Sequence, residues 1–205
     1  MIIGKWNKSV ILTYIGLFIS VLGIYLACTN ENILLAFSCL LIAGVCDLFD
    51  GFVARRCNRT KEEKQFGIEL DSLVDVVNFV ALPIIILINI GLTEIYNIAL
   101  YMFFALAGVV RLAYFNITLE EKNQDIPIKY YSGLPVTFIA MILPISHLLT
   151  YLLNIKCFNV YYTIILLVTG ILNILNVKIR KPYGLAYPLF LLMAIITLIL
   201  FLGVL

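Results

Sequence analysis

Two short stretches of the sequence carry carboxylates at spacings that suit one face of a helix. The first reads Asp47-x-x-Asp50-Gly51-x-x-Ala54-Arg55, and the second reads Gly67-x-x-x-Asp71-x-x-x-Asp75. Residues three or four apart share a helix face. At about 100° per residue, the first pair of aspartates is roughly 60° apart and the second pair roughly 40° apart. Each stretch therefore predicts a helix with two carboxylates on one side, beside small residues.

If the two acidic faces meet, four carboxylates converge. Adjacent like charges resist burial, so such a cluster needs a partner of opposite charge. Carboxylate oxygens suit hard divalent cations, Mg²⁺ or Mn²⁺ with Ca²⁺ as a third candidate. Four carboxylates are enough for two metals, and two-metal sites orient and neutralise phosphate oxygens during displacement reactions. We expect a metal-dependent phosphoryl-transfer site.

The residues between the aspartates fit the same chemistry. Gly51 and Gly67 let a bulky substrate approach the backbone closely, and Arg55 can bind a phosphate through two parallel hydrogen bonds. A charged group at membrane depth costs at least a few kcal/mol, so its presence there indicates function.

Composition places these helices in a membrane. The chain has 205 residues, of which 63% are hydrophobic and 13% charged, whereas soluble domains are nearer half apolar and a quarter charged. We predict an all-α integral membrane protein, a polytopic bundle of transmembrane helices in a single domain, residues 1–205. The net charge of +2 gives no reason to expect a nucleic-acid partner.

A spanning helix needs about 20 apolar residues. Seven segments meet this need: 9–28, 33–55, 67–91, 94–116, 133–153, 158–177 and 184–204. The second and third of these segments carry the carboxylates at their polar ends. Thr60-Lys-Glu-Glu63 is a capping-box pattern, which allows the third helix to begin there. His147, within the fifth segment, is interpreted as an interhelical hydrogen-bonding residue. Tyrosines 130, 131, 161 and 162 are interpreted as a belt at the membrane interface.

Basic residues are distributed asymmetrically about these segments. With a cytoplasmic N-terminus, 13 of the 14 lysines and arginines fall on or near the cytoplasmic side, and only Lys156 lies outside. Positive charge accumulates on the cytoplasmic side of membrane proteins. We therefore expect the N-terminus and the acidic site to be cytoplasmic, in a membrane that is most simply a prokaryotic plasma membrane.

The two acidic stretches together resemble the signature of the CDP-alcohol phosphotransferase family. All eight fixed residues of that signature are present, although eleven residues separate Arg55 from Gly67, a longer spacer than is usual in the family. Three further segments resemble the phosphatidylserine synthase branch: Leu70-Asp-Ser-Leu-Val-Asp75, Arg111-Leu-Ala-Tyr-Phe-Asn116 and Gly133-Leu-Pro135. The likeness covers about residues 9–140.

The resemblance implies a six-helix core and a homodimer. It also implies transfer of the phosphatidyl group from CDP-diacylglycerol to L-serine, giving phosphatidylserine and CMP, with two divalent cations and membrane lipids as surroundings. By position, Asp47, Asp50, Asp71 and Asp75 would be metal ligands, with Asp75 also the general base. The CDP site would include Asp47, Gly51, Ala54, Arg55 and Gly67, with Arg59 and Lys64 as further phosphate contacts.

The acceptor alcohol is the other half of the reaction. Arg111 lies within an apolar segment, and we expect it to bind the serine carboxylate or a lipid phosphate, since arginine matches a carboxylate well. The alternative is a side chain that snorkels to the interface. Thr137 is a weaker acceptor-site candidate. Glycerol phosphate, inositol or inositol phosphate are alternative acceptors on the same fold. A different class of function, an ion transporter, would instead distribute its acids across the depth of the membrane.

Overall fold

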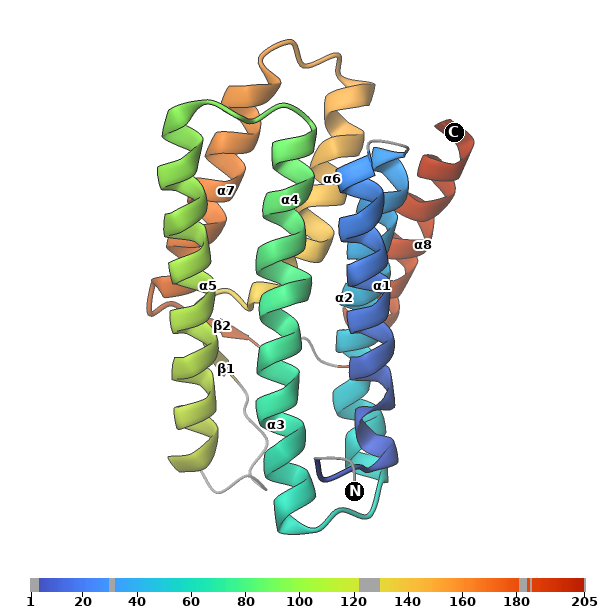
Figure 1. Cartoon of the computed structure of the whole chain (residues 1–205), viewed down its shortest axis with the longest axis vertical. Coiled ribbons are helices and arrows are strands. Elements are labelled where there is room, and N and C mark those ends of the chain that lie inside the picture. Colours follow the sequence, from blue (N-terminus) through green and yellow to red (C-terminus); the bar gives the residue numbers. More distant parts are fainter. Residues whose placement is uncertain (1–3, 30–31, 122–129, 181–183, 185, 205) are drawn as a thin grey trace.

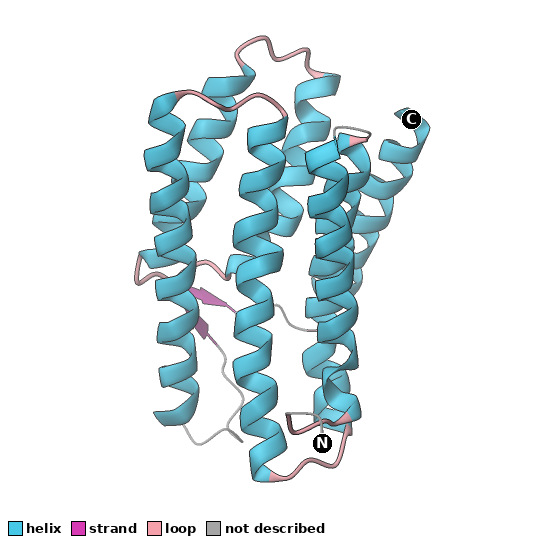
Figure 2. Cartoon of the chain, viewed as in Figure 1, coloured by secondary structure: helices cyan, strands magenta, loops and turns pink. Residues whose placement is uncertain are grey.

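A computed structural model of the chain describes residues 4–29, 32–121, 130–180, 184 and 186–204 (Figure 1). Helices dominate these residues, together with one pair of short strands (Figure 2). In chain order the elements are η1 Lys8–Val10, α1 Ile11–Thr29, α2 Ile33–Arg56, α3 Lys61–Val76, η2 Val77–Ala81, α4 Leu82–Asn89, α5 Ile95–Glu121, β1 Tyr130–Ser132, η3 Val136–Phe138, α6 Ile139–Leu152, α7 Phe158–Ile174, β2 Lys178–Arg180 and α8 Ala186–Val204.

The helices confirm the prediction of a polytopic membrane bundle. Among the described residues, five helical segments are long and apolar enough to span a membrane, namely Lys8–Thr29, Ile33–Arg56, Lys61–Asn89, Ile95–Thr118 and Ala186–Gly203. Two shorter apolar segments, Val136–Leu152 and Phe158–Ile174, complete the set. These seven segments correspond one to one with the seven predicted from hydropathy, including the last.

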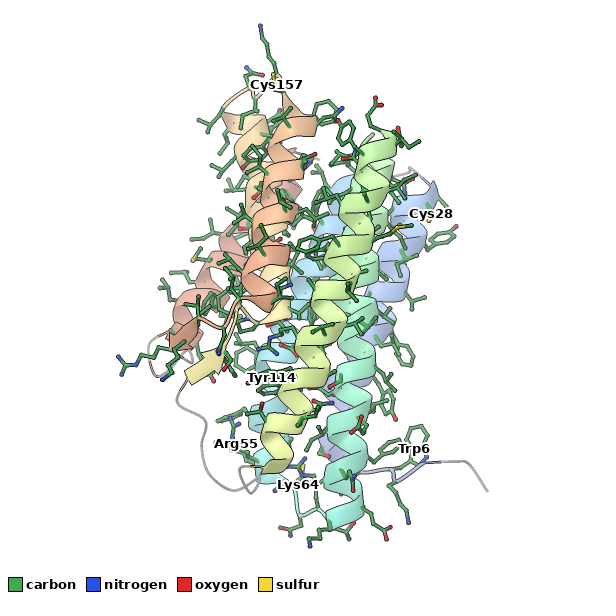
Figure 3. The ribbon with its side chains drawn as sticks, turned by 90° about the vertical axis from the view of Figure 1, so that its left-hand side faces the viewer. Trp6, Cys28, Arg55, Lys64, Tyr114 and Cys157 are labelled. Carbon is green, nitrogen blue, oxygen red and sulfur yellow. The ribbon has the colours of Figure 1, made fainter. Side chains whose placement is uncertain are left out.

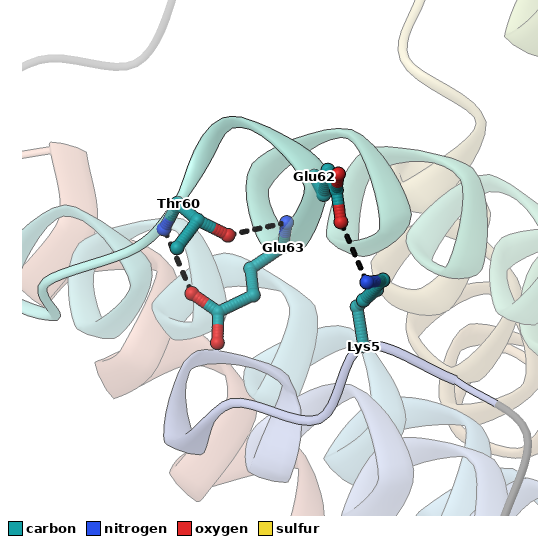
Figure 4. Close-up of polar contacts among 4 residues, drawn as sticks. All are labelled: Lys5, Thr60, Glu62 and Glu63. Atoms are coloured by element: carbon teal, nitrogen blue, oxygen red, sulfur yellow. Dashed lines mark hydrogen bonds and ion pairs between the residues drawn. The ribbon is translucent and has the colours of Figure 1, made fainter.

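The third segment begins at Lys61 rather than at residue 67, and the capping box explains the extension. Thr60 Oγ1 accepts a hydrogen bond of 3.2 Å from the Glu63 amide, and the Thr60 amide donates one of 2.7 Å to Glu63 Oε2 (Figure 4). Lys5 forms an ion pair of 2.6 Å with Glu62, which raises the pKa of the lysine. These contacts tie the N-terminal segment to the start of α3.

The segment α3–η2–α4 is one continuous helical rod that changes geometry midway. Residues Val77–Ala81 form a π-helix, which begins two residues after Asp75. Single π-turns inside helices occur mostly at functional sites. The rod packs beside α1 and α5, and it carries the second acidic stretch into the centre of the bundle (Figure 1).

Strands β1 and β2 pair antiparallel, with Tyr131 opposite Ile179. The turn that follows β1 depends on Gly133, whose φ is +78°. A Cβ at that position would lie 2.6 Å from the Asn173 carbonyl oxygen, so no other residue fits there without displacement. This turn fixes where η3 and α6 start, and hence where residues 135–138 lie.

The buried core runs through the bundle and settles two of the predictions made for polar aromatic residues. His147 of α6 and Tyr162 of α7 are joined by a 2.7 Å hydrogen bond between Nδ1 and the phenol oxygen, which confirms the interhelical role of the histidine. Tyr162 is only 1% exposed, so its assignment to an interface belt was wrong. The sequence pattern cannot separate a belt tyrosine from a buried one that has a polar partner.

Most of the described lysines and arginines gather at one end of the bundle, the charged end, whereas the opposite end has Lys156 next to Cys157. Trp6, Arg55 and Lys64 lie at one end, while Cys28 and Cys157 lie at the other (Figure 3). Lys122, Lys129 and Lys181, three of the basic residues in the charge argument, lie outside the described residues.

Candidate active site

The two acidic stretches meet at a cavity of about 370 Å³, within the usual range of ligand pockets, ~300–1,000 Å³. The helices α2 and α3 form two of its walls and α5 a third. Eleven of the residues singled out from the sequence line the cavity: Asp47, Asp50, Gly51, Ala54, Arg55, Arg59, Gly67, Asp71, Asp75, Arg111 and Thr137. Lys64 is not among the lining residues.

The four carboxylates converge as the helix spacings predict. One carboxylate oxygen from each of Asp47, Asp71 and Asp75 lies within 4.8 Å of the others. Asp50 lines the same cavity as these three aspartates. Thr13 of α1 also donates a 3.4 Å hydrogen bond to Asp50. Asp75 is the most enclosed of the four, with 7% of its surface exposed.

This donor set fits a hard divalent cation. None of the four aspartates forms an ion pair of 4 Å or less within the described part of the chain. Buried carboxylates without a compensating positive charge are strongly unfavourable. Clustered carboxylate oxygens are the ligands that Mg²⁺, Mn²⁺ and Ca²⁺ prefer. The residues present therefore suit the cations that the sequence led us to expect.

At the end of the cavity nearer the charged end of the bundle, two arginines lie near two glycines that leave the helix backbone accessible. Arg55 stands on the last turn of α2, and Arg59 follows in the loop. A Cβ at Gly51 would meet only the Arg55 guanidinium, at 3.6 Å, and a Cβ at Gly67 only Val10, at 3.5 Å. Both glycines leave space between α2 and α3. A phosphate-bearing ligand can thus approach the helix backbones while the arginines face its charge.

Arg111 of α5 supplies a buried cation on the far wall. It is 7% exposed, which argues against a side chain that snorkels to the interface. Its guanidinium carbon lies 5.0 Å from the ring centre of Phe115 and 5.8 Å from that of Tyr131. Its Nε has no hydrogen-bond partner among the described residues. A buried unpaired donor in a cavity is costly, and a ligand carboxylate or phosphate would satisfy it.

Several cavity residues were not proposed as site residues from the sequence. They are Ser9, Val10, Thr13, Ser72, Phe115, Asn116, Tyr131, Pro135 and Tyr187, with further apolar neighbours. Ser72 and Asn116 are joined by a 3.1 Å hydrogen bond between α3 and α5; both stand in segments that resemble the phosphatidylserine synthase branch, and that signal could have indicated them.

Tyr131, which the sequence led us to interpret as an interface residue, lines the cavity. It reaches the site because β1 pairs with β2, a long-range contact with no local signal in the sequence. Burial raises the pKa of its phenol to about 12. The phenol therefore stays protonated at neutral pH and can donate a hydrogen bond.

Comparison with known proteins agrees with this geometry. Residues 6–175 match the family described as CDP-alcohol phosphatidyltransferase. The chain is 38% identical over 112 residues to a CDP-diacylglycerol–serine O-phosphatidyltransferase of Saccharomyces cerevisiae, covering 52% of this chain and 40% of that protein. It is 30% identical over 148 residues to a protein of the same name from Methanocaldococcus jannaschii, covering 71% of this chain and 64% of that protein.

An archaetidylserine synthase of Methanothermobacter thermautotrophicus is 34% identical over 104 residues, covering 50% of this chain and 41% of that protein. The chain thus spans about 40% to 64% of the length of these three relatives. The family match includes both acidic stretches, Arg111 and Thr137, and it ends before α8. The chain belongs to the CDP-alcohol phosphatidyltransferase family.

Proposed function

We propose that this chain transfers the phosphatidyl group of CDP-diacylglycerol to L-serine, giving phosphatidylserine and CMP. The observation that carries the proposal is the convergence of four carboxylates from α2 and α3 on one cavity, opposite the buried Arg111 of α5. The names of the relatives support serine as the acceptor.

Asp47, Asp50, Asp71 and Asp75 would hold two divalent cations, Mg²⁺ or Mn²⁺, with Ca²⁺ as a third candidate. When bound, these ions neutralise the negative charge of the pyrophosphate and of its phosphate leaving group. The chain's own contribution is to hold the ligands on two helices. Helix-borne ligands keep the carboxylates in place more precisely than loop-borne ones do.

Asp75 would act as the general base. In the proposed step the serine hydroxyl oxygen bonds to the phosphorus that carries diacylglycerol, and the bond from that phosphorus to the oxygen of CMP breaks. The hydroxyl proton passes to the Asp75 carboxylate. Asp75 suits this role because it is buried at the inner wall of the cavity, where a substrate hydroxyl meets little competing water. General bases in such positions contribute about 10²–10⁴-fold to the rate.

Arg111 would bind the serine carboxylate. Its guanidinium packs against the rings of Phe115 and Tyr131, which restricts its motion, and its Nε has no hydrogen-bond partner among the described residues. Planar guanidinium groups bind carboxylates through two parallel hydrogen bonds. Thr137, on the wall formed by η3, lines the same cavity and would contact the acceptor.

The nucleotide would lie toward the charged end of the bundle. Gly51, Ala54 and Gly67 would face the cytidine and its ribose, where small residues leave room. Arg55 and Arg59 would contact the phosphates, and Lys64 would act only at longer range, since it does not line the cavity.

The same proposal orients the protein in its membrane. With the charged end cytoplasmic, soluble serine reaches the cavity from the cytoplasm and the lipid reaches it from the bilayer. We further propose a homodimer in a prokaryotic plasma membrane. An ion transporter is the weaker alternative, because the acids of the described cavity gather at one level and do not form a path from end to end.

The test is an acceptor panel with purified protein. CDP-diacylglycerol and Mn²⁺ or Mg²⁺ are supplied with radiolabelled serine, glycerol phosphate, inositol or inositol phosphate in turn, and lipid-soluble label is counted. We expect label from serine alone. Labelled lipid from glycerol phosphate or an inositol, with none from serine, would overturn the choice of acceptor.

A further inference from the structure

An apolar groove adjoins the carboxylate cavity. It is lined by Leu41, Gly44, Val45, Asp47 and Leu48 of α2, by Thr137, Phe138, Ala140 and Met141 of η3 and α6, and by Phe190 of α8. Four of these residues, Asp47, Leu48, Thr137 and Phe138, also line the carboxylate cavity. The groove is therefore continuous with the site, and apart from its two shared polar residues it is apolar.

The groove leads away from the charged end of the bundle. It follows α2 from Leu48, beside Asp47, back to Leu41, a distance of about 10 Å along the helix axis. Its floor is the close contact of α2 with α6, where a Cβ at Gly44 would lie 2.5 Å from the Cβ of Ala140. A lipid whose head is in the cavity would extend its chains in this same direction.

Helix α8 closes the groove from outside, although it lies beyond the residues that match the family. One stripe of α8 is packed against the bundle: Ala194, Thr197 and Phe201 are 1%, 3% and 1% exposed. The ring of Phe201 lies 6.2 Å from that of Phe37 of α2. Nearer the site, the ring of Phe190 packs edge-on against Phe138, with centroids 5.7 Å apart.

We propose that this groove holds one acyl chain of the lipid-linked nucleotide, and that Phe190 of α8 determines which chains fit. The inference rests on the proposed function, because it assumes that the donor's phosphates lie at the carboxylates. The continuity of the groove with the cavity indicates its occupant, because an acyl chain of a donor whose phosphates lie at the carboxylates has this apolar groove beside it. The acyl chain would otherwise lie in the equally apolar bilayer, so the groove would select among acyl chains by shape and packing.

The test compares two donors in the presence of serine. Dibutanoyl CDP-diacylglycerol has acyl chains shorter than the roughly 10 Å length of the groove, whereas the acyl chains of the dipalmitoyl donor are longer than the groove. The variant Phe190→Trp narrows the groove, and Leu192→Ala is a matched control, since Leu192 is on the same helix but 53% exposed.

We expect Phe190→Trp to raise the KM for the dipalmitoyl donor about fivefold or more, as overpacking does elsewhere. The KM for the dibutanoyl donor and the kcat for both should change less than about twofold, the ordinary scatter for sites without contact. The groove assignment would be overturned if Phe190→Trp changed the KM equally for the two donors, or if its ratio of dipalmitoyl KM to dibutanoyl KM equalled that of Leu192→Ala. Either result would leave the proposed function intact. A wild-type protein that uses neither donor would overturn the proposed function and this inference with it.

A second measurement does not depend on the variants folding. A CDP-diacylglycerol with a photoreactive diazirine in one acyl chain is irradiated with the wild-type protein, and the labelled peptides are mapped. Label on Phe190, Met141 or their immediate neighbours that is displaced by unlabelled donor supports the proposal. Label spread over the lipid-facing surface and insensitive to unlabelled donor contradicts it.

Discussion

At the scale of single residues, the proposed reaction gives Asp75 a role that another acid on α3 does not have. Asp75→Asn keeps the shape of the side chain but removes its ability to accept the serine proton. We expect the rate of phosphatidylserine formation to fall by about 10²–10⁴-fold, the usual contribution of a general base. Glu69→Gln is the matched control, because Glu69 is an exposed acid on α3 outside the cavity. An Asp75→Asn protein with full turnover would rule out the assignment of the base.

Arg111 gives a second prediction at this scale. Arg111→Ala should raise the KM for serine by about tenfold or more, since it removes a charge-assisted hydrogen-bonding partner worth roughly 1.5–3 kcal/mol. Arg111→Lys keeps the charge but not the planar fork, so it should restore only part of the affinity. Steady-state kinetics at saturating donor measure both. Unchanged serine dependence in the two variants would place the acceptor elsewhere.

The residues that sequence reasoning found and missed differ in a physical way. Asp47, Asp50, Asp71 and Asp75 could be placed on common helix faces because a regular helix fixes the relation between spacing and direction. Tyr131 and Tyr187 reach the same cavity only through strand pairing and the return of the chain to α8. No local pattern encodes such contacts.

At the scale of elements, the start of α3 depends on its capping box. Thr60→Ala removes the 3.2 Å hydrogen bond to the Glu63 amide and should destabilise the protein by about 1 kcal/mol. For a chain of this size that corresponds to a fall in melting temperature of roughly 2–4 °C. Thr29→Ala is the control, since the Thr29 hydroxyl only donates to carbonyls of its own helix. Equal melting temperatures for the two variants would contradict a capping role.

The turn at Gly133 should be less tolerant. Gly133→Ala forces a side chain into a left-handed backbone conformation with φ of +78° and against the Asn173 carbonyl. We expect a cost of about 1–3 kcal/mol from the backbone alone, seen as a lower melting temperature in detergent. Gly203→Ala meets nothing within 4 Å and should be nearly neutral. If both variants melted alike, the turn would not restrain the fold.

The elements themselves could be predicted well because a membrane helix needs a long apolar run, and seven such runs are separated by polar residues. What could not be predicted is the geometry within them. The π-segment Val77–Ala81 depends on packing against the neighbouring helices, and strands β1 and β2 are only three residues each. Neither produces a periodic signal long enough to recognise.

At the scale of the whole molecule, the distribution of charge predicts an orientation that cysteines can test. Cys28 and Cys157 are exposed and lie at the end opposite Arg55 (Figure 3), whereas Cys57 follows α2 at the charged end. In single-cysteine variants, a membrane-impermeant maleimide added to intact cells should label Cys28 and Cys157 but not Cys57. Labelling of Cys57 alone would invert the orientation.

The proposed function depends on a cation bound where the two acidic helix faces meet, so the need for metal is its most direct test. Phosphatidylserine formation from CDP-diacylglycerol and serine is measured after treatment with EDTA and again after Mn²⁺ or Mg²⁺ is restored, for wild type and for Asp71→Asn. We predict that EDTA abolishes product, that added metal restores it in wild type, and that Asp71→Asn stays at least about 100-fold less active. Undiminished product in EDTA, or full activity of Asp71→Asn, would contradict the account.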